Sequence, residues 1–346
     1  MIVGGPQIEL RDERFSFLQL PGLKMDEEFS GLQTCDPSLS VEEVKTARQK
    51  QLLAFFTATE ADCLIIELYP FGRKAFSFEL KPLLETARQA GCKIYCSLRD
   101  ILVEKKTGRE KHERRALEVL NMYFDGLLIH ADPKVVTLEE TFGLTDQIQV
   151  PLHYTGFVTP RPAAAARTKT RSALGLDHDQ KLIVVSIGSG SVGSYLLEAV
   201  AETVDAVAAA ESGRFQFFTG PYCGEHEQRR LAEHHHPALV VDRFAENFID
   251  LLAAADLSIS MAGYNTSMNI LAAGVPALML PFAQNREQRL RVEQLTADHP
   301  IRLLHMEDLS PERLIPIIRS QLRSPRYQTA IDLNGAGQTL NIIETG

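Results

Sequence analysis

Polar residues and glycines in the second half of the chain are spaced as an anion-binding pocket requires. Two apolar segments, residues 257–260 and 277–280, are predicted strands, and the helix between them begins with Gly263, Asn265 and Thr266. Such a helix start offers free backbone N–H groups and a hydroxyl to an anion. In open α/β sheets, ligands bind beyond the carboxyl ends of the strands, where this cluster lies. The alternative is an ordinary βα unit with a well-capped helix.

A glycine-rich turn provides a second candidate phosphate site. The segment Gly188-Ser189-Gly190-Ser191-Val192-Gly193 follows a predicted strand at 181–187 and precedes a predicted helix at 192–210. Its spacing is that of a dinucleotide fingerprint, which also needs an acidic residue ~20 positions further on, after the next strand. That strand, 215–218, is followed by Thr219-Gly220-Pro221 instead. The pattern therefore favours a phosphate-binding turn, with Ser186, Ser189 and Ser191 as extra donors, over an NAD or FAD site.

The elements around these motifs predict two α/β domains. Strands at 15–20, 63–68, 93–97 and 126–130 alternate with helices at 41–59, 78–89 and 109–123, which is typical of mainly parallel sheets. A Pro/Ala/Arg/Thr-rich stretch then predicts a linker, after which the alternation restarts. We therefore expect an N-terminal domain at 1–155, a linker at 156–180, a C-terminal domain at 181–325 and a tail helix at 326–346, with a cleft between the domains.

Composition narrows the class of protein. The 346 residues are enough for two cores, and 45% apolar and 23% charged residues are ordinary for a soluble protein. No segment reaches the ~18 apolar residues of a membrane span, and no secretory signal is recognised at the N-terminus, so we expect a cytoplasmic protein. The net charge of −9 argues against nucleic-acid binding. Five cysteines fit buried thiols in a reducing compartment better than disulfides or zinc.

Taken together, these motifs resemble the donor half of GT-B glycosyltransferases, and within them the MurG-like family 28 group. The resemblance extends to three N-terminal motifs, Glu67-Leu68-Tyr69-Pro70-Phe71-Gly72-Arg73, Ser97-Leu98-Arg99-Asp100-Ile101-Leu102 and His153-Tyr154-Thr155-Gly156. It implies an α/β chain of two Rossmann-like domains facing across a cleft. It also implies a nucleoside-diphosphate sugar such as a UDP-sugar as the donor substrate, with no cofactor.

The resemblance also assigns roles in donor binding. In the family, the glycine-rich turn and the Gly-x-x-Thr helix start hold the pyrophosphate, the residue after the arginine meets the base, and the Glu-Gln pair meets the donor sugar. The resulting donor-binding set is Gly188, Ser189, Gly190, Ser191, Arg243, Phe244, Gly263, Asn265, Thr266, Asn269, Glu287 and Gln288. Asn269 stands where many relatives have a glutamate that chelates the ribose hydroxyls, and a neutral amide lacks that charge-assisted strength.

A second departure concerns the N-terminal domain. The family begins with a strand, a loop carrying Gly-His and a helix, whereas MIVGGPQIEL resembles the family's second strand. Either the true start lies upstream, or the acceptor domain is incomplete and its sheet has an edge that needs covering. Besides a glycosyltransferase, we therefore keep two alternatives: a sugar-nucleotide epimerase or hydrolase on the same fold, and a nucleotide-sugar-binding subunit that depends on a partner subunit.

The expected reaction is inverting displacement at the anomeric carbon by an acceptor hydroxyl, with a nucleoside diphosphate leaving. It needs a general base and stabilisation of the leaving phosphate, for which helix N-termini and Arg243 or Arg286 could replace a metal. Candidates for the base are Glu67, Asp100 and His130, each near a predicted strand end, where a cap or salt bridge is the structural alternative.

Two further segments contain side chains of the types that bind metals or anions. The consecutive histidines 234–236 diverge in direction on a helix, so no metal site is predicted. The segment 104–115 mixes basic and acidic residues, and it is either a solvated helix or a dock for an anionic acceptor or lipid headgroup at the inner face of a membrane. The acceptor would be a saccharide, a lipid-linked group or a small molecule. The basic residues of the segment are Lys105, Lys106, Arg109, Lys111, His112, Arg114 and Arg115.

Overall fold

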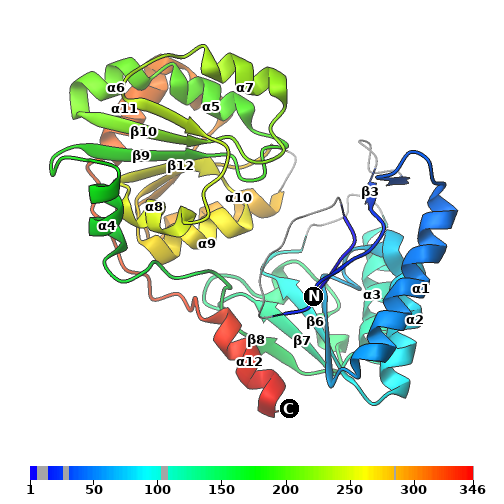
Figure 1. Cartoon of the computed structure of the whole chain (residues 1–346). Helices are drawn as coiled ribbons and strands as arrows, with labels where there is room; N and C mark the ends of the chain where they lie inside the picture. The colour runs from blue at the N-terminus through cyan, green and yellow to red at the C-terminus, as the bar shows by residue number, and fades with distance from the viewer. Residues whose placement is uncertain (6–14, 26–30, 103–107, 284–285, 346) are drawn as a thin grey trace.

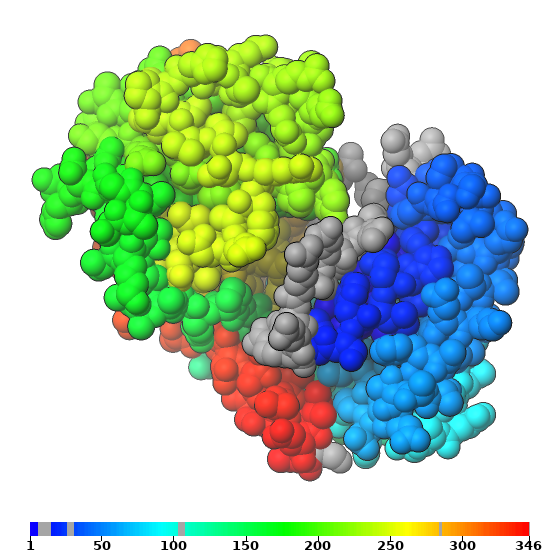
Figure 2. All heavy atoms as spheres, viewed as in Figure 1, coloured from blue at the N-terminus to red at the C-terminus, as the bar shows by residue number. Residues whose placement is uncertain are grey.

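The computed structural model describes residues 1–5, 15–25, 31–102, 108–283 and 286–345, which form two α/β lobes. Figure 1 shows an N-terminal lobe, coloured blue to cyan, and a C-terminal lobe, coloured green to yellow. The last helix, α12 (Gly335–Thr345), lies against the N-terminal lobe although its sequence follows the C-terminal one. In the space-filling view the two lobes are separated by an indentation that opens upwards (Figure 2).

The N-terminal lobe is built on a four-stranded parallel sheet of order β5-β6-β7-β8. Helices α1, α2 and α3 pack on one face, where their apolar side chains meet alternate residues of β6 and β7. Two shorter pairs, β1-β2 and β3-β4, form separate small sheets. The elements of this lobe are β1 (Ile2–Val3), β2 (Leu18–Gln19), β3 (Leu23–Met25), β4 (Leu32–Thr34), α1 (Val41–Thr59), β5 (Cys63–Glu67), α2 (Ser77–Gln89), β6 (Lys93–Arg99), α3 (Arg109–Tyr123), β7 (Gly126–His130) and β8 (Leu152–Tyr154).

The C-terminal lobe contains a six-stranded parallel sheet of order β11-β10-β9-β12-β13-β14. Alternate residues of β9 enter two different cores: Ile183 and Val185 pack with α5, α6 and α11, whereas Leu182 and Val184 pack with α8 and α9. Both faces are thus covered by helices, as a parallel sheet requires. The elements are α4 (Ala166–Ala173), β9 (Lys181–Ser186), α5 (Ser194–Ala201), α6 (Val204–Glu211), β10 (Gly213–Phe218), α7 (Glu225–Ala232), β11 (Leu239–Asp242), α8 (Phe248–Ala254), β12 (Leu257–Met261), α9 (Tyr264–Ala273), β13 (Ala277–Leu280), α10 (Arg286–Thr296), β14 (Ile301–Leu303) and α11 (Pro311–Gln321).

The strand order of this sheet defines where a ligand can bind. Counted from β9 as the first strand, it is 3-2-1-4-5-6, so the direction of winding reverses between β9 and β12. The loops that leave these two neighbouring strands go to opposite faces of the sheet. They leave a crevice at the carboxyl ends of the strands, the usual ligand position in doubly wound sheets.

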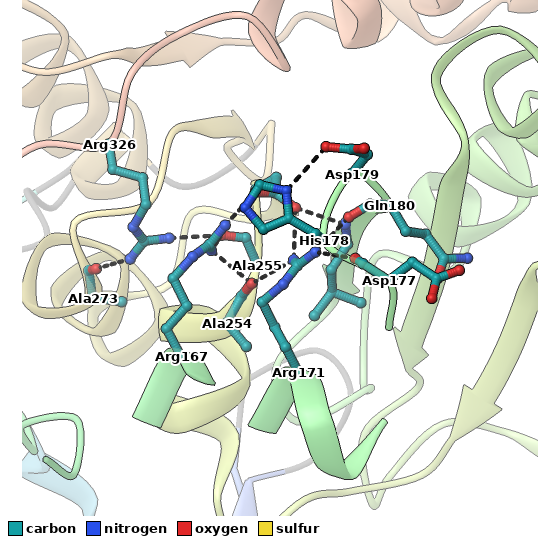
Figure 3. A network of polar contacts seen from close by, with 12 residues as sticks. Arg167, Arg171, Asp177, His178, Asp179, Gln180, Ala254, Ala255, Ala273 and Arg326 are labelled. Atoms are coloured by element: carbon teal, nitrogen blue, oxygen red, sulfur yellow. Dashed lines mark hydrogen bonds and ion pairs between the residues drawn. The ribbon is translucent and has the colours of Figure 1, made fainter. Parts of the chain in front are cut away.

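Local structure differs from expectation in two places. The segment expected as a linker contains helix α4, which packs on α8. Arginines 167 and 171 of α4 form ion pairs with Asp256, at 2.7 and 3.0 Å, and donate to carbonyl groups at the end of α8 (Figure 3). These pairs could not be predicted from the low-complexity composition of the segment. In addition, the helix expected at 192–210 is broken at Glu202 and Thr203 into α5 and α6.

The tail connects the two lobes. Arg326 donates to the carbonyl oxygens of Ala255 and Ala273, at the ends of α8 and α9, so the chain is held on the C-terminal lobe before it crosses (Figure 3). Beyond the crossing, the amide of Asp332 donates to the carboxylate of Asp132 at 2.9 Å. The amide of Phe157 donates to the carbonyl oxygen of Asp332, and the carbonyl oxygen of Phe157 accepts from the amide of Gly335. The tail therefore fixes α12 to the N-terminal lobe.

Candidate functional site

A cavity of about 460 Å³ lies at the crevice between β9 and β12. It brings together residues from the β9 turn, the start of α9, the loop after β11, and Pro160 from the segment between the lobes. Seven residues of the predicted donor-binding set line it: Gly188, Ser189, Arg243, Phe244, Asn265, Thr266 and Asn269. The set is therefore assembled from three chain segments that are far apart in sequence.

The β9 turn can form only with glycine at its centre. Gly190 has φ +89°, and a Cβ there would lie 2.4 Å from the carbonyl oxygen of Thr219 and 2.7 Å from the amide nitrogen of Cys223. The amide of Tyr222 also donates to the carbonyl oxygen of Ser189 at 2.8 Å. The loop after β10 thus supports the turn from behind, which explains why Gly190 and Ser191 do not line the cavity themselves. Positive φ without a Cβ clash is the property that only glycine supplies.

The start of α9 faces the same cavity. Its N-cap residue, Gly263, is extended and makes no side-chain cap hydrogen bond. Gly263 thus provides no side-chain acceptor for the amides of the first turn. The side chains of Asn265 and Thr266 line the cavity. A helix N-terminus with free amides carries a partial positive charge, which favours a phosphate. Asn269, one turn further on, accepts a hydrogen bond from the Thr159 hydroxyl at 2.8 Å.

The loop after β11 forms an apolar end of the cavity. Phe244 is 68% exposed at the rim, and Phe218, Phe248 and Ile249 form the wall behind it. An exposed aromatic ring over an apolar wall can stack on a planar base. The Arg243 guanidinium donates to the carbonyl oxygen of Pro221, which holds it at the cavity. The cavity thus combines an aromatic end with an end of free amides and hydroxyls.

Glu287 and Gln288 do not line this cavity. Gln288 accepts a hydrogen bond from the amide of Phe282 at 3.0 Å and so caps the loop before α10. Glu287 lies 3.8 Å from the guanidinium of Arg291, and burial raises its pKa, while the nearby positive charge of Arg291 opposes that shift. Residues 284–285, between the strand and this pair, lie outside the described part of the chain.

The three candidate bases lie together at the strand ends of the N-terminal lobe, in different states. Asp100 is not available as a base, because both of its oxygens are bound by Arg291 of the other lobe, at 2.6 and 2.8 Å. Both side chains of this pair are only 1% exposed. Glu67 is half-exposed and accepts from Arg73 and Arg99. Of the two readings offered for Asp100, a base or a salt bridge, the structure shows a salt bridge, and it joins the two lobes.

His130 is the candidate whose surroundings suit proton transfer. Its Nε2 lies 2.8 Å from the Ser97 hydroxyl and its Nδ1 lies 2.9 Å from the Thr155 hydroxyl. Burial lowers its pKa; the Glu67 carboxylate opposes this shift and the Arg99 guanidinium adds to it. The imidazole is therefore kept neutral near pH 7.

Tyr264 joins this cluster to the donor cavity and was missed from sequence. Its hydroxyl donates to the carbonyl oxygen of His130 and accepts from the amide of Val158, each at 3.2 Å. Its ring lies under the guanidinium groups of Arg99 and Arg291. Burial raises its pKa to about 12, so the hydroxyl stays protonated. Its position inside a glycine-rich helix start was the available signal, since a large aromatic residue there must pack on something.

Among the described residues, no group of three His, Cys, Asp or Glu side chains is close enough to hold a metal ion. Nor does any helix of the described ranges have the length and apolarity to cross a bilayer. Of the mixed-charge segment, Lys105 and Lys106 lie outside the described residues. On α3, Arg114 pairs with Glu110 at the surface, as on a solvated helix, whereas Arg109 pairs with Glu113, which is buried.

The chain is similar to known proteins in sequence and in fold. The family model "Glycosyltransferase family 28 C-terminal domain" matches residues 184–338. The UDP-N-acetylglucosamine--N-acetylmuramyl-(pentapeptide) pyrophosphoryl-undecaprenol N-acetylglucosamine transferase of Vibrio cholerae is 31% identical over 142 residues, which are 40% of this chain and 39% of that protein. The match thus spans less than half the length of that relative.

Solved structures match the chain at lower sequence identity than this relative, but the match extends over nearly the whole fold. MurG of Acinetobacter baumannii superposes with a TM-score of 0.54 at 14% identity, covering 95% of this chain and 85% of that one. A UDP-glucosyltransferase from Polygonum tinctorium gives 0.56 at 13% identity, covering 96% and 87%. At these identities the likeness concerns the fold, which is the two-domain GT-B arrangement predicted from the sequence.

Proposed function

From a C-terminal domain of the glycosyltransferase family 28 type, carried on a MurG-like GT-B fold, we propose that this protein transfers a sugar from a nucleoside-diphosphate sugar to an acceptor hydroxyl. The observation that carries the proposal is the cavity at the β9/β12 crevice. It offers amides and hydroxyls from two neighbouring loops at one end and Phe244 at the other. A nucleoside diphosphate has the matching parts, a planar base and a dianionic or trianionic pyrophosphate.

The reaction is a displacement at the anomeric carbon. The acceptor oxygen forms a bond to that carbon, the bond to the β-phosphate oxygen breaks, and the acceptor proton goes to a base. The leaving diphosphate gains negative charge, and the free amides of the first turn of α9 and the β9 turn stabilise it. Attack from the side opposite the leaving group inverts the configuration. Positive charge and dipoles from Arg243 and the helix start serve this step without a metal ion.

The donor and acceptor classes follow from the relatives. Because the Vibrio cholerae relative is named for a UDP-sugar donor and a pyrophosphoryl-undecaprenol acceptor, UDP-sugars are the first donors to test. The acceptor classes are lipid-linked groups, saccharides and small molecules, and a lipid-linked acceptor would bring the protein to the inner face of a membrane. Dependence on a partner subunit is tested by activity of the purified chain alone.

Nucleotide binding is the first measurement. The melting temperature of the purified chain is recorded with UDP, GDP, ADP, dTDP and NAD, each far above its dissociation constant. A ligand at ~100 times its dissociation constant stabilises the folded state by about 2.7 kcal/mol. A shift with one nucleoside diphosphate is the expected result and identifies the base. A shift with NAD alone, or with none of the five, contradicts the proposal.

Product analysis then separates transfer from donor conversion. With the UDP-sugar alone, an epimerase yields a different UDP-sugar and a hydrolase yields free sugar at its full rate. A transferase turns over fully only when an acceptor is added. Release of UDP that does not rise with any acceptor class would favour the hydrolase alternative.

A further inference from the structure

The clearest chemical arrangement outside the donor cavity is a row of hydrogen bonds at the strand ends of the N-terminal lobe. Ser97 lies on β6, His130 ends β7, and Thr155 follows β8. Because side chains alternate along a strand, Glu67, Ser97, Arg99 and His130 share the sheet face opposite α2 and α3. Three neighbouring parallel strands thus place a hydroxyl, an imidazole and a second hydroxyl in one line.

The direction of each hydrogen bond is fixed by Thr155. This side chain is fully buried, and its hydroxyl donates to backbone carbonyl oxygens, Gly156 at 2.9 Å and Ile129 at 3.3 Å. Carbonyl oxygens can only accept, so the threonine proton is used there. Nδ1 of His130 must therefore carry a proton and donate it to Thr155. Nε2 then has a free lone pair that accepts from the Ser97 hydroxyl.

From this geometry we propose that Ser97 and His130 form a proton-relay dyad that removes the proton from the acceptor hydroxyl, with Thr155 as the residue that sets the tautomer of His130. The inference rests on the proposed glycosyl transfer and assigns its base. The acceptor O–H gives its proton to Ser97 Oγ as Ser97 gives its own proton to His130 Nε2. The acceptor oxygen bonds to the anomeric carbon, the diphosphate leaves with the bonding electron pair, and His130 ends as an imidazolium.

The position of the dyad relative to the donor cavity supports this role. Tyr264 is the first residue of α9, and its hydroxyl holds the carbonyl oxygen of His130. The next two residues, Asn265 and Thr266, line the cavity where phosphate is expected. His130 is therefore joined to the phosphate end of the cavity by a single residue. Ser97 and His130 are both only partly buried, so an acceptor can approach them.

The charges around His130 set its working range. Glu67 of β5 and Arg99 of β6 act on it in opposite directions, and the Tyr264 phenol contacts its backbone. The Asp100–Arg291 ion pair lies beyond the tyrosine ring. Burial is the largest effect, and the pKa of His130 is lowered as a result. The dyad is therefore competent at neutral pH and is switched off by acid, when Nε2 becomes protonated.

The test uses the full chain, UDP-N-acetylglucosamine as the donor and water as the acceptor, with UDP release as the signal. Wild type should show a rate that falls on the acid side with an apparent pKa below ~6.5, the ordinary histidine value. His130→Gln should lower the rate of UDP release by about 100-fold or more, the usual contribution of a general base. Its rate should also no longer fall on the acid side of the pH profile. Ser97→Ala should lose rate, and Ser97→Thr should restore it by returning a hydroxyl. Thr155→Ser should leave the pH at which the rate falls on the acid side unchanged, whereas Thr155→Val should shift that pH.

Controls separate the dyad from the fold and from the donor site. His153→Gln changes a histidine on the neighbouring strand β8 and should leave rate and pH profile unchanged. UDP should shift the melting temperature of every variant equally. His130→Gln retaining the wild-type rate or its acid limb overturns the proposal. Absence of nucleotide binding in wild type is a different result, which refutes the donor site itself.

Discussion

Breaking the ion pair between Asp100 and Arg291 should be one of the most destabilising single changes at the junction of the two lobes. The two bonds, at 2.6 and 2.8 Å, join a strand end of one lobe to helix α10 of the other, and both side chains are 1% exposed. Burial disfavours the charge on Arg291, but the hydrogen bonds and charge of Asp100 outweigh it and raise the arginine pKa. Removing one partner leaves the other charge buried without compensation, which costs about 3–5 kcal/mol.

Asp100→Asn is the direct perturbation, since it removes the charge and keeps the shape. We expect its free energy of unfolding in urea to fall by about 3–5 kcal/mol. The matched control is Arg289→Ala on the same helix, because Arg289 and its partner Glu293 are 61% and 44% exposed. That exposed pair should contribute no more than about 0.5 kcal/mol.

Replacing both partners distinguishes the penalty of a buried charge from the strength of the bond. Asp100→Leu combined with Arg291→Met removes both charges, so most of the loss seen in Asp100→Asn should be recovered. If Asp100→Asn costs less than about 1 kcal/mol, or if the double variant is as unstable as the sum of two single variants, the pair is not desolvated in solution. The lobes would then be held by the tail crossing rather than by this contact.

Three further predictions concern the proposed donor site and the packing of α4 on the C-terminal lobe. Thr266→Ala should weaken UDP binding by roughly 1–2 kcal/mol through a lost charge-assisted hydrogen bond, with unchanged stability in the absence of ligand; equal affinities would remove Thr266 from the site. Gly190→Ala should abolish the UDP-induced melting shift and destabilise the fold more than Gly91→Ala, which has a similar φ of +72° but an unobstructed Cβ position and should cost about 1–2 kcal/mol. Burial alone would raise the pKa of Asp256, but the Leu182 amide and two arginines outweigh burial, so the pKa is lowered. The ionised Asp256 therefore stabilises the folded state above pH ~4, and this stabilisation is lost as the pH falls through the folded-state pKa. Asp256→Asn should flatten this part of the profile of unfolding free energy against pH.

The sequence was sufficient to predict the elements that position the donor site. The order of strand, glycine-rich turn and helix around Gly188, and again around Gly263, was predictable because local periodicity and backbone requirements determine it. That both turns meet at one crevice followed from a general property of parallel sheets, without any knowledge of side-chain contacts. Asn265, Thr266 and Asn269 line one cavity together with Gly188 and Ser189.

The cluster of candidate bases at the strand ends of the N-terminal lobe was less predictable, because its hydrogen bonds and ion pairs join residues far apart in the chain. Asp100 stands at a strand end, as a functional carboxylate would, but its partner is 191 positions away. No local pattern distinguishes a carboxylate that meets a buried arginine from one that meets a substrate. Ser97 was missed for a related reason, since a serine in an apolar strand becomes informative only when the neighbouring strand is known to end in histidine.

The GT-B arrangement offers a physical reason for placing a tyrosine in the first turn of α9. In the proposed donor site the amides of that turn bind an anion, so the helix start cannot use an ordinary side-chain cap, and Gly263 provides none. The helix is instead held by the Tyr264 ring, packed under two guanidinium groups, and by its hydroxyl, which bonds the backbone at Val158 and His130. Because Tyr264 is bound to the opposite lobe, the amides of the helix start stay available. The same contacts fix the position of the proposed donor site relative to the strand ends that carry the proposed base. Donor position and acceptor activation would then depend on one side chain, so that a shift of α9 displaces both together.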